Sequence, residues 1–168
     1  MTKIWTEMDR DGDQLKVQVN VQDAPPDFLG TSFHLDFYGP TVSSWDYELG
    51  SVFGEEKPFV LVGEKDNALV AGISFQRGNR EKIPDGNLIT FYVQVDGDEN
   101  VDLSFDYPVL SRFENGRKDA EGVEWVGFSE SFESKGDELS TDEGMDQESE
   151  QESQLETSKV FQTSTLTY

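Results

Sequence analysis

Hydrophobic and polar residues alternate along two neighbouring segments in the middle of the chain. Every second side chain is apolar in residues 69–75, and residues 88–95 repeat the pattern. The apolar positions are Leu69, Ala71, Ile73, Phe75, Ile89, Phe91, Val93 and Val95. Because successive side chains of a β-strand point to opposite faces of a sheet, this period of two predicts two strands that each bury one face. Between them, Pro84-Asp85-Gly86 favours a turn, since proline presets φ and glycine tolerates positive φ.

The same pattern recurs along the rest of the chain and predicts an all-β domain. Further candidate strands lie at residues 14–22, 32–37, 45–49, 59–62, 101–107 and 123–129. Turn residues separate them, and no amphipathic helix of useful length is visible. About nine short strands with turns between them are typical of a two-layer β-sandwich.

Composition divides the chain into three parts. Residues 1–13 are polar, and we expect a flexible N-terminal segment or an edge strand there. Residues 14–129 contain the predicted sandwich. From residue 130 onward Ser, Glu, Asp, Gln and Thr dominate, so this part cannot bury enough apolar surface to offset the entropy of ordering it. We predict that residues 130–168 form a disordered acidic tail or linker, whose last residues, 159–168, could add a strand to a sheet edge.

Charge and composition exclude several classes of function. Thirteen basic and 35 acidic residues give a net charge of −22, which repels nucleic acid and anionic lipid and favours cations and basic partners. No apolar run reaches the roughly 18 residues of a membrane span. The chain has no cysteine, so disulfides and thiolate chemistry are excluded. The N-terminus also lacks the apolar core of a signal peptide.

Three segments of the chain resemble cohesin domains, which are nine-stranded jelly-roll sandwiches of bacterial and archaeal surface proteins that bind dockerin modules. The first is the central pair, with its AGIS run, its polar loop and the strand LITFYVQV that opens after Asp85-Gly86. The second is Phe28-Leu29-Gly30 followed by alternating apolar residues and Pro40, and the third is ELGSVF at 48–53. The likeness covers roughly residues 14–129. One departure is Phe37-Tyr38-Gly39-Pro40, which lacks the aspartate of the family's Tyr-Asp-Pro.

The resemblance implies a jelly-roll topology and a protein-binding face on one sheet, built from residues 32–37, 59–62, 69–75 and 101–107. The partner-binding residues that it implies are Ser32, His34, Asp36, Val60, Val62, Val70, Ser74, Ser104 and Asp106. Among these, Val60, Val62 and Val70 would form an apolar centre inside a polar rim. The resemblance also implies a dockerin-like partner, a role in scaffolding or adhesion, and an extracellular or cell-surface location as part of a longer chain.

Two other classes of function stay open. Exposed aromatic rings on a β-sandwich can form a flat platform for polysaccharide, and the candidates are Trp45, Tyr47, Tyr92 and Trp125. A purely structural role, as a spacer or a decoration domain, also fits the composition.

Catalytic and metal-binding motifs are sparse. His34 is the single histidine and falls at an outward strand position, and no G-x-S-x-G motif is present, so we predict a protein that is not an enzyme. We expect no cofactor other than calcium, whose candidate ligands are Asp96, Asp98, Asn100 and Asp102. Hard cations prefer such oxygen donors, but hairpin turns use the same residues.

Overall fold

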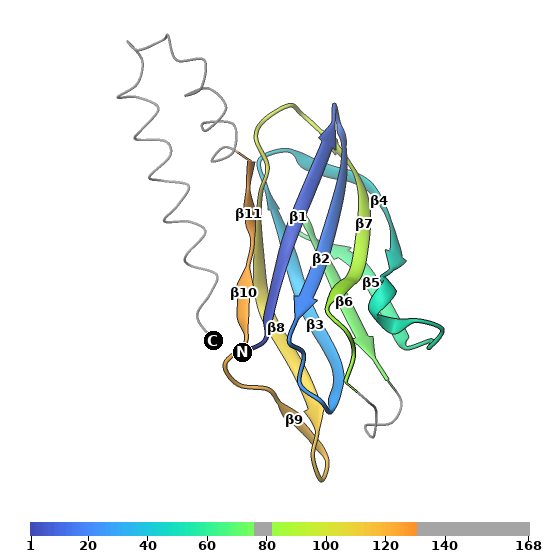
Figure 1. Cartoon of the computed structure of the whole chain (residues 1–168). Helices are drawn as coiled ribbons and strands as arrows, with labels where there is room; N and C mark the ends of the chain where they lie inside the picture. The colour runs from blue at the N-terminus through green and yellow to red at the C-terminus, as the bar shows by residue number, and fades with distance from the viewer. Residues whose placement is uncertain (76–81, 131–168) are drawn as a thin grey trace.

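The computed structural model describes residues 1–75 and 82–130, which form two β-sheets that face each other (Figure 1). The five-stranded sheet has the order β10-β1-β2-β7-β4. Its strands are β10 (Glu124–Val126), β1 (Lys3–Asp11), β2 (Gln14–Gln22), β7 (Gly86–Asp96) and β4 (Thr41–Leu49). The all-β sandwich predicted from the sequence is therefore confirmed.

The second sheet has six strands, five of them in the order β11-β8-β3-β6-β5. Their bounds are β11 (Phe128–Ser129), β8 (Asp102–Phe113), β3 (Phe28–Tyr38), β6 (Ala68–Ser74) and β5 (Phe59–Lys65). The sixth strand, β9 (Arg117–Asp119), pairs with the end of β8. A short 3-10 helix, η1 (Ser51–Phe53), follows β4. The described residues contain no helix that is long and apolar enough to cross a membrane.

The core lies between the sheets and consists of the side chains that the alternation marks as inward. All eight apolar positions of the two central segments are at most 7% exposed. Aromatic rings from both sheets fill one end of the core: Phe105 packs edge-on against Phe33 and against Trp125, with ring centroids 5.2 Å apart in each pair. Such edge-to-face contacts are favourable beyond the area that they bury.

The N-terminal residues form a strand of the sandwich, β1, rather than a flexible segment. β1 pairs with β2 along its whole length, whereas β10 pairs only with Lys3, Ile4 and Trp5 on its other side, so residues 6–11 lie at a sheet edge. Its inward positions are Ile4, Thr6, Met8 and Arg10, which oppose the inward residues of β2. Two of these four side chains are polar, and this hides the period of two in the sequence. The predicted tail lies outside the described residues, except for Glu130 at its start.

Candidate functional site

The four segments that the resemblance assigns to a binding face lie side by side in one sheet, as strands β8, β3, β6 and β5. We call the side of these strands that points away from the core the outer face. Ser32, His34 and Asp36 of β3 lie on it, because they alternate with the buried Phe33, Leu35 and Phe37. Ser32 is exposed, whereas His34 and Asp36 are half-buried.

Charged groups gather where β3 and β8 meet on the outer face. His34 is the direct cross-strand neighbour of Asp106. Partial burial, together with the negative charge of Asp106, raises the pKa of Asp36 above its usual value of 3.8. Burial is the main cause that raises the pKa of the Tyr38 hydroxyl, and the negative charge of Asp36 raises it further. This part of the face therefore favours positively charged groups.

One predicted member of the face is not accessible. Ser104 alternates with Leu103 and Phe105 and opposes Asp36, so it points outward, but only 6% of it is exposed. Its neighbours on the sheet cover a side chain this small, and Ser104 cannot contribute appreciable contact area to a partner.

The predicted apolar centre is displaced by one residue on β5. Val60 and Val62 oppose Ile73 and Ala71 of β6, and they pack against the core. The prediction that these valines face a partner is therefore wrong. The outward residues are Phe59 and Leu61, which are 65% and 78% exposed. A shift of one residue moves every side chain of a strand to the other face, and here both sets are apolar.

Small side chains form the floor between β5 and β3. Leu61 opposes Gly72, which in turn opposes Ser32, and Phe59 opposes Ser74. The partly buried Val70 follows along β6. The resulting groove has a volume of about 550 Å³, and Phe59 and Leu61 line it together with Ser32, Gly72 and Ser74.

Tyr107 is a prominent residue of the outer face that the sequence-based prediction omitted. Its backbone has the left-handed value φ = 51°, which is unfavourable for a residue with a bulky side chain. It lies where the β3–β8 register shifts, between Ser32 and His34, and it is followed by Pro108. The ring is 65% exposed and meets the His34 ring edge-on, with centroids 5.1 Å apart. A proline in a strand marks such an irregularity, but it does not reveal where the preceding side chain points.

The four aromatic residues of the predicted sugar platform do not form one flat surface, although Trp45 and Tyr92 line the same groove. Trp125 is 3% exposed and belongs to the core, so it cannot stack on a ligand. Trp45 opposes the inward Val93, and its indole N–H donates to Glu64 of the facing sheet at 3.2 Å. Tyr92 points outward from the five-stranded sheet and donates its hydroxyl to Glu48 at 3.1 Å. Tyr47 opposes Phe91 and therefore faces the other way from Tyr92.

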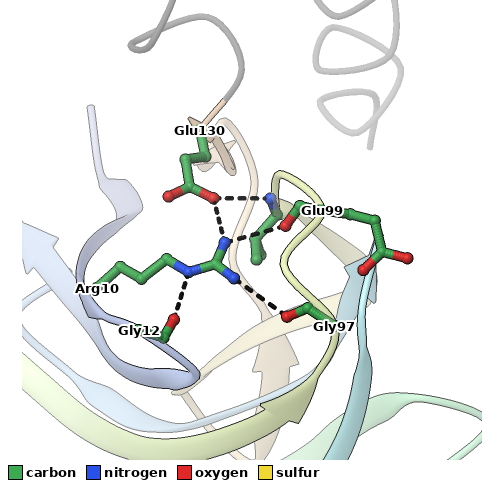
Figure 2. Close-up of polar contacts among 6 residues, drawn as sticks. Arg10, Gly12, Gly97, Glu99 and Glu130 are labelled. Carbon is green, nitrogen blue, oxygen red and sulfur yellow. Dashed lines mark hydrogen bonds and ion pairs between the residues drawn. The ribbon is translucent and has the colours of Figure 1, made fainter.

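The turn that was predicted to hold calcium contacts an arginine. Figure 2 shows the Arg10 guanidinium between the Glu130 carboxylate and backbone carbonyls of the β1–β2 hairpin and of the β7–β8 turn, which connects the two sheets. It donates to Gly12 at 2.8 Å, to Glu99 at 3.0 Å and to Gly97 at 3.4 Å, and it pairs with Glu130 at 2.7 Å.

The four predicted calcium ligands do not form a cluster. Asp96, Asp98 and Asn100 are exposed, whereas Asp102 lies on β8, where burial raises the pKa of its carboxyl group. Within residues 1–75 and 82–130, no three acidic or histidine side chains come together as a metal site would require.

Comparison with known proteins identifies the fold. No protein-family model and no curated protein matches the chain. Among solved structures, a non-cellulosomal cohesin from the archaeon Archaeoglobus fulgidus matches with a TM-score of 0.59 and 16% identity, over 76% of this chain and 88% of that one. The second type II cohesin module of the adaptor ScaA scaffoldin of Acetivibrio cellulolyticus has a TM-score of 0.62 and 14% identity, over 76% and 88%.

A third match was solved together with its partner. The third cohesin of ScaC from Acetivibrio cellulolyticus, in complex with the ScaB dockerin, has a TM-score of 0.59 and 15% identity, over 77% of this chain and 96% of that one. The matched structures are covered almost completely, in agreement with the jelly-roll sandwich expected from the sequence motifs. The chain therefore has the cohesin fold.

Proposed function

We propose that this chain is a non-catalytic module that binds a dockerin-like protein through the outer face of β8, β3, β6 and β5. The observation that carries the proposal is the arrangement of side chains on this face. Exposed apolar residues on β5, small residues on β6 and β3, and aromatic and charged residues at the β3–β8 boundary give the apolar centre and polar rim that protein interfaces require.

The dimensions of the face suit a helical partner. β8 and β5 are three strand spacings apart, or about 14 Å. An α-helix with its side chains is about 10–12 Å across, so one helix fits between Tyr107 on β8 and Leu61 on β5. The small floor residues Ser32 and Gly72 would allow it to approach the sheet closely.

Charge favours a partner with basic residues at one end. Asp36 and Asp106 lie beside His34, and the whole chain carries a net charge of −22. A lysine or arginine of the partner would relieve the repulsion between the two carboxylates, and the overall charge would accelerate the encounter. Several solved structures with this fold are complexes with dockerins, which supports the proposed class of partner. By the same reasoning, we place the module in an extracellular or cell-surface scaffold or adhesin.

The test is calorimetric titration of the purified chain with a panel of dockerin modules, with calcium and with a chelator. For a module that binds, Tyr107→Ala should weaken affinity about 30-fold, which corresponds to an interface hot spot of about 2 kcal/mol. Ser32→Arg should block binding, because it fills the floor and repels a basic partner. Tyr92→Ala, on the opposite sheet, should bind as the wild type does. Failure of every dockerin to bind, or wild-type binding by both outer-face variants, would contradict the proposal.

Polysaccharide binding is a second candidate, and one observation favours it. A groove of about 400 Å³ crosses the outward side of the five-stranded sheet, lined by Tyr92 and Trp45 with Lys16, Asp46 and Gln94. The exposed Tyr92 ring, flanked by hydrogen-bonding side chains, suits a sugar ring. Binding on a glycan array that Tyr92→Ala abolishes and Tyr107→Ala leaves intact would assign function to this groove instead.

A further inference from the structure

The sandwich has four sheet edges, and three of them carry features that prevent pairing with another strand. β10 has only three residues, and the part of β1 that extends beyond it carries the exposed acidic residues Glu7, Asp9 and Asp11. The edge of β8 is covered at its two ends by the short strands β9 and β11, and Pro108 interrupts it between them. β4 has a register irregularity between Val42 and Ser44 and carries the exposed acidic residues Asp46 and Glu48. Short strands, prolines, bulges and charges are the usual means of keeping edges unpaired.

The fourth edge, β5, is neither short nor interrupted, and it carries charge only at its end. Its seven residues pair with β6 in an unbroken register, and no proline lies within the strand. Residues 59–62 are all apolar, and the two charged residues, Glu64 and Lys65, come at its end. Leu61 and Phe59 are among the most exposed large hydrophobic side chains of the described residues. A regular apolar edge of this kind is a template for another strand.

We infer that β5 pairs antiparallel with β5 of a second copy of this chain, around a two-fold axis at Leu61. Residues that oppose each other across such a pair must point to the same face. With the axis at Leu61, the ladder covers residues 59–63. Leu61 opposes itself, and Val60 opposes Val62 of the second copy. Phe59 opposes Gly63 of the second copy, and the vicinity of Gly63 has room for the ring because nothing lies within 4 Å of where a Cβ atom would be.

The segment itself argues for a second copy as the occupant. The ladder 59–63 contains no charged side chain, and each apolar residue from 59 to 62 gains an apolar or glycine neighbour. The charged residues of β5, Glu64 and Lys65, lie beyond the ladder. A two-fold interface uses the same surface twice, so such self-complementarity is what it requires. The result is one continuous sheet whose two outer faces point to the same side. The dimer would therefore present two binding faces together, and its existence does not depend on which partner they bind.

The first test is sedimentation velocity of the full chain over a concentration series, without any partner. The wild type should shift from a 19.0 kDa monomer towards twice that mass. Leu61→Lys should weaken the dimer at least about tenfold, since it removes apolar burial and places two like charges across the axis. Tyr92→Lys, a similar change on the other sheet, should dimerise as the wild type does. Leu61 is 78% exposed, so its substitution should not disturb the monomer's fold, and circular dichroism checks this.

The second test locates the axis. The chain has no cysteine, so a single introduced cysteine reports only its own pairing. Directly opposed residues of antiparallel strands lie about 4.5–5.5 Å apart between Cα atoms, within disulfide range. Leu61→Cys should therefore give a covalent dimer on mild oxidation, whereas the exposed Ser32→Cys control should remain monomeric.

Three results would overturn the inference. One is a wild-type chain that stays monomeric at every concentration, and another is a dimer that persists unchanged in Leu61→Lys. The third is a combined result, in which Leu61→Cys fails to cross-link and deletion of residues 131–168 abolishes the dimer. It would mean that the C-terminal segment of the second copy, and not its β5, pairs with the edge. Sedimentation without any partner separates this inference from the proposed function. A monomeric wild type that binds a dockerin would overturn only the inference, and a dimer that binds none would overturn only the proposed function.

Discussion

Replacement of Arg10 by methionine should lower the free energy of unfolding of the protein by a large amount, although the side chain lies at one end of the sandwich. Arg10 is the contact between the β1–β2 hairpin, the β7–β8 turn and Glu130, which lie far apart in the sequence. Methionine keeps most of the aliphatic length of the side chain but removes all the donors. The change therefore isolates the polar contacts from the packing.

The magnitude follows from the three shorter contacts, at 2.7–3.0 Å. A hydrogen bond contributes about 0.5–1.5 kcal/mol net, and one between charged groups about 1.5–3 kcal/mol. The Arg10 and Glu130 side chains are 16% and 19% exposed, so water replaces only part of what is lost. We expect a fall of about 2–3 kcal/mol in the free energy of unfolding. For a domain of this size, that lowers Tm by roughly 6–15 °C.

Urea denaturation and calorimetry of Arg10→Met provide the measurement, with Arg117→Met as the matched control. Arg117 lies 3.5 Å from Asp119 and donates to Ser111 at 3.0 Å, but its side chain is more than 60% exposed, so its loss should cost less than about 1 kcal/mol. Glu130→Gln in the Arg10→Met background should cost less than it does in the wild type, because its partner is already absent. If Arg10→Met were no more destabilising than Arg117→Met, the contact of Figure 2 would not stabilise the fold.

Three further substitutions test other parts of the structure. Gly50→Ala should destabilise by about 3 kcal/mol in urea denaturation, since its Cβ atom would lie 1.8 Å from the Asn87 carbonyl oxygen, whereas Gly72→Ala, with free space, should be near neutral. Asp36→Asn should raise Tm at neutral pH, because the folded-state pKa of Asp36 is raised and its charge opposes folding; this gain should shrink as pH falls towards 3.8. Asp27→Asn should do the opposite. The hydrogen bond from Arg112 lowers the pKa of Asp27, so Asp27 stabilises the fold above pH 3.8, and the Tm difference should vanish as pH falls through the folded-state pKa. A flat pH profile for either difference would contradict these assignments.

The central strands could be predicted because the periodicity of their own residues is sufficient. In β2, β6 and β7 the inward residues are apolar, and most outward residues are polar or small, so the sequence fixes which face is buried. The same holds for β3, and for that reason Ser32, His34 and Asp36 could be assigned to the outer face. β1 could not be recognised in this way, because Thr6 and Arg10 point inward. Two of the three carbonyls that accept from Arg10 belong to the β7–β8 turn, nearly ninety residues away.

Trp125 shows the limit for short elements. Its strand has three residues, too few to establish a period, and a tryptophan between glutamate and valine resembles an exposed ring as much as a buried one. Its burial follows from the parallel pairing of β10 with β1, which places Trp125 beside Ile4 and above Phe33 and Phe105. A parallel pair between the two ends of the domain leaves no local signal in the sequence.

β5 is the case in which sequence periodicity is ambiguous by its nature, and the ambiguity has a physical cause. A strand that buries one face and exposes the other should alternate, but residues 59–62 are apolar on both faces. The register with β6 decides that Val60 and Val62 face the core, so Phe59 and Leu61 are exposed. Apolar surface left in water is unfavourable, and nothing in the monomer compensates for it. Apolar residues on both faces are typical of strands that are covered on both faces. The residues that made this strand hard to assign are thus the ones that argue for a covered β5, by a partner on the outer face, by a second copy along the edge, or by both at once.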